Sequence, residues 1–380
     1  GLEKRPKLRF PGFDEPWKMV SLQDISEYRK NKFCVSKLKY ISTENMLQNF
    51  AGIIPYTSEE DISGVEFCVG DTLLANIRPY LRKAWLATHD GACSTDVLAL
   101  CPLDITPAFL NNIIEQDRFI DYVMSGVKGS KMPRGDKAHI LAYETAIPSL
   151  LEQEKINSFM QLLHQRIAKI QMEIELLKKY KRGVNNQILS QIDNSYNCRL
   201  GSVCEIVGGG TPDTLHTEYW GNTVEWFTPS EIGKTKYVNN SVRKLSDIGL
   251  DNSSAKLLPI GTVLLTTRAT LGEMSIAKRE CSTNQGFQSL IPHTDRVSSE
   301  YLYYMQIIIK PWCEKYASGN TFREISKSAL SDCIIPIPDR ARQEQIVKLL
   351  SSIDMLIGAA ESISMSLSKI RHGLMQQLFI

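Results

Sequence analysis

The sequence predicts an α+β protein in which two globular domains alternate with two long helices. Three observations lead to this fold class. The chain of 380 residues is too long for one ordinary core and suits two domains. Landmarks in its first half recur roughly 190 residues later, and each half ends in a long stretch with the apolar spacing of a helix. Short runs rich in β-branched residues, typical of strands, lie in the rest of each half.

The composition is that of a globular protein, with 43% hydrophobic and 23% charged residues. A net charge of +2 does not indicate a nucleic-acid partner, but it permits local basic surfaces. No apolar run is long enough to cross a membrane, and residues 1–13 lack the apolar core of a signal peptide. The nine cysteines are scattered, without a Cys-x-x-Cys pair. This pattern predicts reduced, buried thiols, no zinc site and a cytoplasmic location.

The internal repeat is clearest around two Ile-Pro pairs, Ile147-Pro148 and Ile337-Pro338. A Gln-Glu pair follows each of them, and a glycine stands thirty residues after each glutamine, at Gly183 and Gly373. Equal spacing over such a length indicates a duplication. Further anchors align Leu73-Leu74 with Leu264-Leu265, Arg78 with Arg268, Ala87 with Ala277, Cys93-Ser94-Thr95 with Cys281-Ser282-Thr283, and Ser125-Gly126 with Ser318-Gly319.

A helical period follows each Ile-Pro pair. Apolar residues recur every three or four positions from Ile156 to Ile188 and from Ile346 to Leu378, without a proline, as in a coiled-coil seam. A rod of about 36 residues is roughly 50 Å long. We predict that the two helices pack against each other in antiparallel orientation, which gives a pseudo-two-fold axis and fixes the separation of the globular domains. Two alternatives stay open: each helix packs on its own domain, or the seam forms a homodimer.

The remaining segments combine strand-like runs with helical windows at 107–124 and 299–316, so each globular domain is predicted to be α+β. We therefore expect a first globular domain over 1–147, a first helix over 148–192, a second globular domain over 193–338 and a second helix over 339–380.

Several motifs carry a resemblance to a known family. They are Pro6-Lys7-Leu8-Arg9-Phe10-Pro11-Gly12-Phe13, Gly208-Gly209-Gly210-Thr211-Pro212, Glu225-Trp226-Phe227-Thr228-Pro229, Asn284-Gln285-Gly286-Phe287 and Ile335-Pro336-Ile337-Pro338 with Gln343-Glu344-Gln345-Ile346. With them the chain resembles the DNA specificity subunits of Type I restriction–modification systems, over its whole length and most strongly in the second half. The first domain departs from the pattern, because it lacks the Gly-Gly-Thr-Pro opening and has Asp96 where the second half has Asn284.

The resemblance implies two target recognition domains separated by two helices. It also implies that two copies of a DNA-adenine methyltransferase subunit dock on the helices and that restriction–translocase subunits join this core. S-adenosylmethionine would then be bound by the methyltransferase partner and not by this chain.

The residues themselves predict no active site. Gly208-Gly209-Gly210-Thr211 is not followed by Gly-Lys-Ser/Thr, so the phosphate-binding loop of a nucleotide hydrolase is not indicated. The Asn/Asp-Pro-Pro-aromatic strip of an adenine methyltransferase is missing, and the six histidines are dispersed. We therefore predict a non-catalytic protein without metal or cofactor.

Candidate DNA contacts are exposed polar and basic residues in loops, because base edges are read by hydrogen bonds and phosphates by cations. In the first domain we predict Arg78, Tyr80, Lys128, Ser130, Lys131, Arg134 and Lys137. In the second domain we predict Thr211, Thr228, Arg268, Thr270, Asn284, Gln285, Asn320 and Arg323. The alternative for each is an ordinary surface or turn-forming role.

Together these features predict that each domain reads one half of a bipartite, asymmetric DNA target, while the helices set the unread spacer. The alternatives are a coiled-coil scaffold that binds only protein, and a stand-alone DNA-modifying enzyme. The spacing of residues in the sequence does not predict the target sequence, the spacer length, the DNA affinity of the isolated chain or its oligomeric state.

Overall fold

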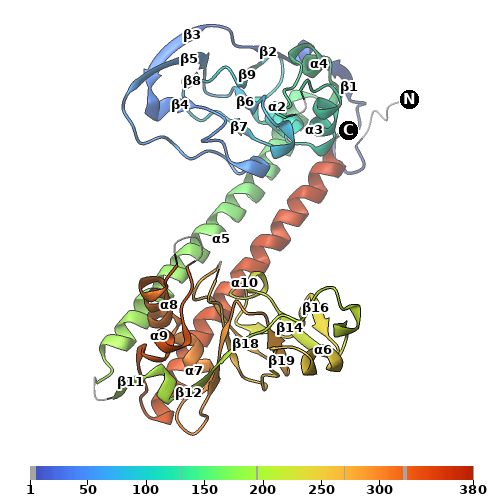
Figure 1. Ribbon diagram of the computed structural model, residues 1–380. Coiled ribbons are helices and arrows are strands. Elements are labelled where there is room, and N and C mark those ends of the chain that lie inside the picture. The colour runs from blue at the N-terminus through green and yellow to red at the C-terminus, as the bar shows by residue number, and fades with distance from the viewer. Residues whose placement is uncertain (1–5, 130, 194–195, 269, 320–322, 380) are drawn as a thin grey trace. The chain divides into compact units, whose positions relative to one another are not determined.

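The computed structural model describes residues 6–129, 131–193, 196–268, 270–319 and 323–379. Contacts divide the chain into two compact units, one formed by Gly1–Met172 with Glu361–Ile380 and the other by Glu173–Ala360. Each unit contains one globular α+β domain and part of each of two long helices (Figure 1).

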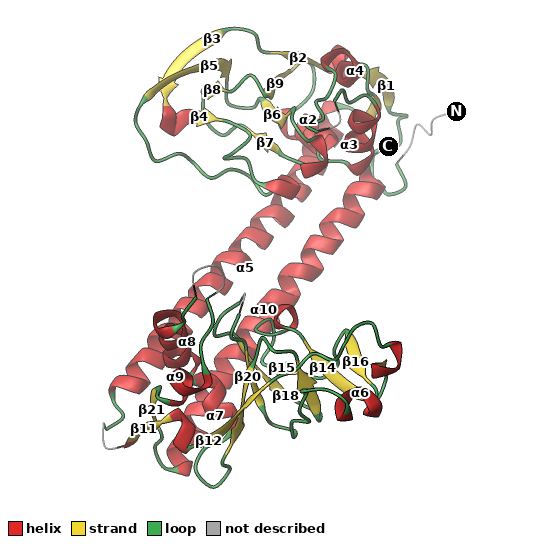
Figure 2. Cartoon of the chain, viewed as in Figure 1, coloured by secondary structure: helices red, strands yellow, loops and turns green. Residues whose placement is uncertain are grey.

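The first globular domain has two four-stranded sheets, in the orders β2-β9-β6-β7 and β3-β5-β8-β4, and a separate two-stranded pair, β1-β10. The strands are β1 (Lys18–Ser21), β2 (Ser26–Tyr28), β3 (Lys32–Ser36), β4 (Tyr40–Ile41), β5 (Asp61–Phe67), β6 (Thr72–Ala75), β7 (Ala84–Leu86), β8 (Gly91–Cys93), β9 (Val97–Pro102) and β10 (Glu144–Ile147). The helices are α1 (Leu22–Ile25), α2 (Pro107–Ile114), α3 (Asp117–Ser125) and α4 (Lys137–Leu141). In Figure 2 the helices α2, α3 and α4 gather on one side of the strands.

The second globular domain has a five-stranded sheet, β12-β20-β17-β18-β15, a four-stranded sheet, β13-β16-β14-β19, and the pair β11-β21. The strands are β11 (Asn197–Arg199), β12 (Cys204–Gly208), β13 (Trp220–Gly221), β14 (Val224–Phe227), β15 (Tyr237–Val238), β16 (Arg243–Leu245), β17 (Val263–Leu265), β18 (Met274–Ala277), β19 (Cys281–Thr283), β20 (Gln288–Pro292) and β21 (Ile334–Pro336). The helices are α6 (Asp247–Asp251), α7 (Ser299–Tyr304), α8 (Gln306–Tyr316) and α9 (Lys327–Ser331). Short 3₁₀ turns lie at Lys37–Lys39, Gln48–Phe50, Pro79–Leu81, Leu200–Ser202, Thr217–Tyr219 and Pro229–Glu231.

Each domain is layered because neighbouring residues of a strand point to opposite faces of the sheet. On β6, Leu74 packs in the core shared with the helices, while Leu73 and Ala75 pack toward the second sheet. On β17, Leu265 packs with the helices and Leu264 toward the second sheet. The same order of layers, helices then sheet then sheet, is therefore built twice.

The two long helices are α5 (Leu150–Ser190) and α10 (Arg340–Leu378). In the first unit Ile156, near the start of α5, shares a core with Leu378 at the end of α10. In the second unit Ile188, near the end of α5, shares a core with Ile346 near the start of α10. The helices therefore pack together in antiparallel orientation, and equivalent positions of the repeat meet in both units. The predicted fold class is confirmed.

Hydrogen bonds establish the duplication residue by residue. Gln153 Nε2 donates to the carbonyl of Pro148 at 3.0 Å, and Gln343 Nε2 donates to the carbonyl of Pro338 at 2.9 Å. The backbone N–H of Thr106 donates to Gln153 Oε1, and that of Ser298 donates to Gln343 Oε1, at 2.9 and 3.2 Å. Each buried glutamine thus fastens the start of a long helix to its own globular domain.

The strand register corrects part of the alignment drawn from the sequence. Ile41 pairs with Cys93, and in the second domain the equivalent parallel pair joins Phe227 to Thr283. Cys93 is therefore equivalent to Thr283 and not to Cys281, and Asp96 is not the counterpart of Asn284. The sequence alignment matched two similar Cys-Ser-Thr triplets that lie two positions apart in the fold.

All nine cysteines are free; those at positions 93, 204, 281, 313 and 333 are buried, whereas Cys34 is exposed. The prediction of buried thiols is therefore wrong for Cys34. Within the described residues, no helix combines the length and the apolar character needed to cross a membrane.

Candidate nucleic-acid interface

In the first domain, three loops distant in sequence meet at the end of β6. The N–H of Asn76 donates to the carbonyl of Asp96 at 2.8 Å, and the N–H of Arg78 donates to the carbonyl of Pro133 at 2.8 Å. The N–H of Gly135 donates to the carbonyl of Asn76 at 3.1 Å. The structure thus brings the 76–82 loop and the 126–137 segment, which both carry predicted DNA contacts, to one edge.

The side chains at this edge are exposed and mostly basic. Arg78 has a left-handed backbone, with φ of 51°, and starts the Pro79–Leu81 turn that exposes Tyr80. Arg134 Nη2 lies 3.0 Å from Asp96 Oδ1, and Lys128 forms an ion pair with Asp136. Lys131 is exposed. Lys137, the first residue of α4, lies 5.9 Å from the centre of the Tyr28 ring, and Ser130 lies outside the described residues.

The glycines of this segment are explained by packing and turn geometry. A Cβ on Gly126 would lie 2.2 Å from the His139 ring, and Gly129 has a φ of +91°, a backbone conformation that favours glycine. Close approach of this backbone to a phosphate stays a prediction.

In the second domain, four loops meet at the equivalent edge. The N–H of Thr267 donates to the carbonyl of Gly286 at 2.7 Å, and the N–H of Gly210 donates to that of Thr283 at 2.8 Å. The N–H of Asn284 donates to the carbonyl of Phe227 at 3.1 Å. The loops that carry Thr211, Thr228, Arg268 and Gln285 are therefore neighbours.

Most of the predicted contacts of the second domain also have partners within the protein. Thr211 donates to Gln285, and Asn284 Oδ1 accepts the N–H of Gly286 at 2.9 Å. Thr228 donates to Glu231 from its N–H and its hydroxyl, at 2.8 and 2.7 Å, and Thr270 donates to the carbonyl of Pro229 at 3.4 Å. Thr228 and Asn284 therefore also stabilise turns, as the alternative interpretation expects.

The two remaining arginines of this edge are held in different ways. Arg268 Nη2 lies 2.9 Å from Glu324 Oε2. Arg323 Nη2 donates to the carbonyls of Glu314 and Ala317, which end α8, so its guanidinium caps that helix. Asn320 lies outside the described residues.

Arg78 and Arg268, aligned in the sequence, are not structural counterparts. Asn76 and Thr267 are equivalent, because their backbone N–H groups donate to the carbonyls of Asp96 and Gly286, which lie in the turns before β9 and β20. Arg268 therefore corresponds to Ile77, one position before Arg78. An extra residue between the two strands accounts for the difference.

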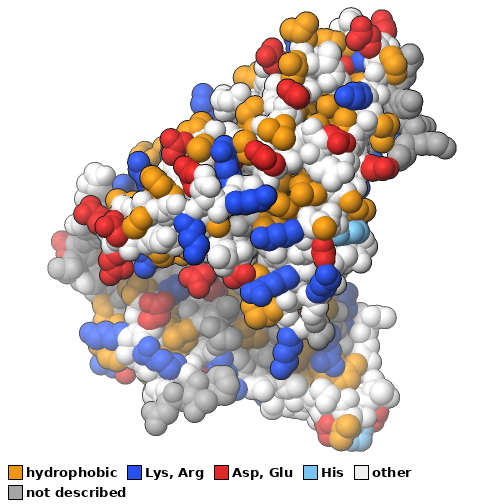
Figure 3. All heavy atoms as spheres, turned by 90° about the horizontal axis from the view of Figure 1, so that it is seen from above, with side chains coloured by type: hydrophobic (Ala, Val, Ile, Leu, Met, Phe, Trp, Pro, Cys, Tyr) orange, Lys and Arg blue, Asp and Glu red, His pale blue; other side chains and the backbone are white. Residues whose placement is uncertain are grey.

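Sequence reasoning missed the acidic residues of both edges, namely Asp96, Asp136 and Glu324. The hydrogen bond from Lys128 lowers the pKa of the Asp136 carboxyl to about 2. The face in Figure 3 likewise shows Lys and Arg side chains interspersed with Asp and Glu. The only available signal was that two of these carboxylates stand within the very segments that carry the predicted cations.

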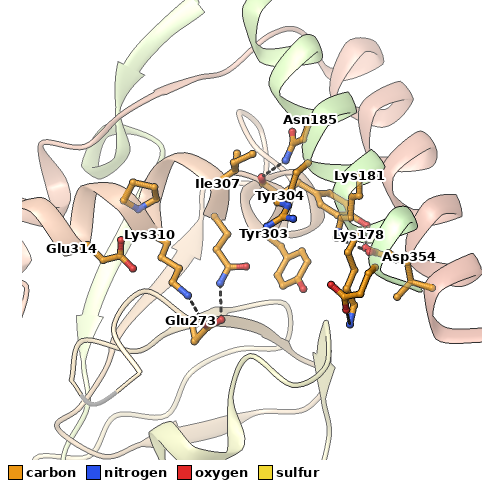
Figure 4. Close-up of a pocket in the computed structure, with 15 residues that line it drawn as sticks. Lys178, Lys181, Asn185, Glu273, Tyr303, Tyr304, Ile307, Lys310, Glu314 and Asp354 are labelled. Carbon is orange, nitrogen blue, oxygen red and sulfur yellow. Dashed lines mark hydrogen bonds and ion pairs between the residues drawn. The ribbon is translucent and has the colours of Figure 1, made fainter. Parts of the chain in front are cut away.

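A cavity of about 590 Å³ lies between α5, α8 and α10 in the second unit. Two of the lysines that line it are paired: Lys310 Nζ lies 2.5 Å from Glu273 Oε1 (Figure 4), and Lys181 Nζ lies 2.5 Å from Asp354 Oδ1. Tyr304 donates to Asp354 at 2.8 Å. These contacts tie α8 to the loop before β18, and α5 to α10.

No group of three or more His, Cys, Asp and Glu side chains that could hold a metal occurs among the residues described. Burial raises the pKa of the Cys93, Cys204, Cys281, Cys313 and Cys333 thiols to about 12, which keeps them protonated and unreactive.

The geometry defines a class of binding protein with two α+β domains, whose loops display Arg, Lys and Tyr at one sheet edge of the first domain and Arg, Thr and Gln at the equivalent edge of the second. Comparison with known proteins places it more closely. Residues 193–365 match the family model of the Type I restriction modification DNA specificity domain. The chain is 35% identical over 186 residues to the Type I restriction enzyme MjaIX specificity subunit of Methanocaldococcus jannaschii, covering 48% of this chain and 43% of that relative.

Other relatives extend the similarity to the whole chain. The putative Type I restriction enzyme MjaX specificity subunit of the same organism is 22% identical over 99% of this chain and 96% of its own length. The EcoR124I/EcoR124II specificity subunit of Escherichia coli is 25% identical over 55% of this chain and 53% of its own length.

Two solved structures share the fold. One, from work on complex assembly and conformational transition of the type I R-M system, has a TM-score of 0.62 at 20% identity and covers 98% of both chains. The other is the Type I restriction-modification S subunit from M. genitalium, with a TM-score of 0.60 at 13% identity over 99% of both chains.

The chain belongs to the family of Type I restriction–modification DNA specificity subunits. This family is non-catalytic and carries no cofactor, since S-adenosylmethionine is bound by the methyltransferase partner. The predicted family and the predicted non-catalytic function are confirmed.

Proposed function

We propose that this chain selects a bipartite, asymmetric DNA target, with one half-site read by each globular domain. The observation that carries the proposal is the convergence, in both domains, of polar and basic side chains at the same edge of the fold. Specific reading needs base-edge contacts supported by phosphate contacts. The two edges carry different residues around the same backbone frame, which favours two unlike half-sites.

The helices supply the second part of the proposal. Both are continuous, over 41 and 39 residues, and each contributes to the core of both units. We propose that their length sets the unread spacer between the half-sites. Removal of one helical turn from each at equivalent positions should change the spacer and leave both half-site sequences intact; an unchanged spacer would refute this part.

The partners follow from the family. We propose that two methyltransferase subunits dock on the helices, that restriction–translocase subunits join them, and that the complex acts in the cytoplasm. The exposed apolar residues of the helices, such as Leu162, Leu176, Met355 and Ile363, are consistent with helical partners.

Methylome sequencing of a cell that expresses this chain with its methyltransferase subunit tests the function directly. We expect modified adenines in one bipartite motif with a constant spacer. Modification without a motif, or no modification, would contradict the proposal.

Gel-shift measurements separate the alternatives. Binding of random duplexes at low salt, with and without the methyltransferase, would exclude a scaffold that binds only protein. Methyl transfer or cleavage by the isolated chain would instead support a stand-alone enzyme.

A further inference from the structure

Arg268, one of the proposed DNA contacts, is held by a carboxylate at the same surface. Its Nη2 lies 2.9 Å from Glu324 Oε2, and the Thr267 hydroxyl lies 3.5 Å from Glu324 Oε1. The backbone of Glu324 exchanges two hydrogen bonds with that of Ser318, at 3.0 and 2.9 Å, which fix the backbone that carries the carboxylate. The two side chains are 43% and 35% exposed, which leaves both accessible to a ligand.

The first domain has the same arrangement from different residues. Arg134 Nη2 lies 3.0 Å from Asp96 Oδ1, with the side chains 57% and 38% exposed. The carbonyl of Asp96 accepts the N–H of Asn76, so the backbone that carries this carboxylate is also held at the edge by a hydrogen bond.

The internal repeat shows that the two ion pairs do not occupy equivalent positions in the two domains. The bridge between Lys128 and Arg134 corresponds to the bridge between Ser318 and Glu324, so Arg134 and Glu324 occupy equivalent positions. The charge at this position is reversed, yet each edge still presents one guanidinium bound to one carboxylate.

A structural role does not account for such pairs. Half-exposed ion pairs contribute little to stability, because both charges are well solvated when they are apart. A fixed carboxylate at a DNA-binding edge repels phosphates and occupies the guanidinium that would bind them. Its clearest effect is therefore on which DNA is bound.

We propose that Glu324 and Asp96 are specificity-determining residues that restrain Arg268 and Arg134. Each carboxylate holds its arginine away from phosphates on unrelated DNA. The arginine leaves the carboxylate when a guanine offers its O6 and N7 atoms, which accept two hydrogen bonds from one guanidinium. This inference rests on the proposed function, since it assumes that these edges contact DNA.

Fluorescence anisotropy with the full chain and its methyltransferase subunit tests the proposal. Titrations use a random-sequence duplex over a series of KCl concentrations, and the duplex identified by the methylome. Glu324→Gln keeps the shape of the side chain and removes its charge. We expect about fivefold tighter binding of the random duplex, and a plot of log K against log salt that is steeper by about 0.9, because one more cation reaches a phosphate. The ratio of cognate to random affinity falls.

Asp332→Asn is the matched control, because it breaks another exposed Arg–carboxylate pair of the second globular domain, one that belongs neither to the proposed DNA-binding edge nor to the long helices. Arg199 Nη1 lies 3.5 Å from Asp332 Oδ1, with the side chains 71% and 59% exposed, and Arg199 lies on β11, which pairs with β21. We expect no change in either affinity. Addition of Arg268→Gln to Glu324→Gln should abolish the gain, and Asp96→Asn should reproduce it through the first domain.

The outcomes are distinguishable. If Glu324→Gln matches the Asp332→Asn control, or weakens cognate binding without strengthening random binding, the carboxylate is not a restraint and the inference is wrong. The second result would indicate direct recognition of a cytosine amino group. If the unmodified complex binds neither duplex at low salt, the proposed function fails as well.

Discussion

The two globular domains share the same arrangement of helices and first sheet, and they differ in the second sheet and in the loops at the candidate DNA-binding edge. In both, a buried glutamine joins the long helix to the start of a helix of the globular domain, α2 or α7, and the same antiparallel strands pack under the helices. The second sheet is different. Its parallel pair is kept as β4·β8 and β14·β19, but the antiparallel strands attach to β8 in the first domain and to β14 in the second.

This difference has a physical explanation in the layers. The sheet beneath the helices is packed on both faces, so a change in its register would move apolar side chains out of two cores. The second sheet packs against the first sheet on one face, and its other face carries only a small cluster in the second domain, around Trp226 and Leu245, which permits a new strand order. The domains therefore differ most in the layer farthest from the helices and in the loops at the reading edge.

The largest effect is expected from the two equivalent glutamines. Gln153→Ala and Gln343→Ala each remove a side chain that is 1% exposed and makes three hydrogen bonds. The loss of a buried group with its partners left unpaired costs about 3 kcal/mol. Hydrogen exchange measured by mass spectrometry should show loss of protection in the start of α2 and α5 for the first variant, and of α7 and α10 for the second.

Equal losses of stability and of protection would confirm that the two buried glutamines contribute equally to their units. A silent variant on either side would show that the two glutamines are equivalent in geometry but not in energy, and would break the comparison at its strongest point.

A second prediction concerns a contact found in the first unit alone. Arg9 makes two hydrogen bonds of 2.8 Å to Glu152, whose side chain is 1% exposed. Glu152→Ala should destabilise the first unit by about 2 kcal/mol, somewhat less than for a fully buried pair because Arg9 regains water. The equivalent residue, Arg342, bonds Gln345 on its own helix at 3.3 Å, so Arg342→Ala should change stability by less than about 0.5 kcal/mol. Urea denaturation measures both, and similar losses would contradict the asymmetry.

The sequence predicted the helices, the duplication and the α+β character, because these depend on patterns that span many residues. Gln153 and Gln343 were visible as landmarks, but their function was not, since Thr106 and Ser298 lie 47 and 45 residues away. The alignment of Asp96 with Asn284 was wrong because the repeat contains small shifts that only the strand register reveals. The candidate edges were identified from loop composition, whereas the acidic partners of their cations required coordinates.

A third prediction compares the cations of the two edges. Lys131 is exposed in a segment rich in cations, whereas the guanidinium of Arg323 is bound to two carbonyls at the end of α8. Lys131→Ala should weaken binding of all duplexes about threefold and reduce the slope of log K against log salt by about 0.9. Arg323→Ala should leave the slope unchanged and lower thermal stability instead. An unchanged slope for Lys131→Ala would remove this residue from the interface, and a reduced slope for Arg323→Ala would place the second edge on phosphates.

The smallest effect is expected at two equivalent helix caps. Asp136 accepts the N–H groups of Ala138 and His139 at 2.9 and 3.1 Å to cap α4, and its pKa is lowered to about 2 from an ordinary value of 3.8, mainly by the hydrogen bond from Lys128. Because the folded pKa is the lower one, the stabilisation is complete above the ordinary value and is lost as the pH falls through 2. At the equivalent position Ser326 caps α9 by accepting the N–H of Ala329 at 3.2 Å, and a hydroxyl does not titrate in this range. Amide chemical shifts should therefore change between pH 4 and pH 2 at Ala138 but not at Ala329, and Asp136→Ser should abolish the change. Titration of both caps together would instead indicate general acid unfolding and would remove this distinction between the domains.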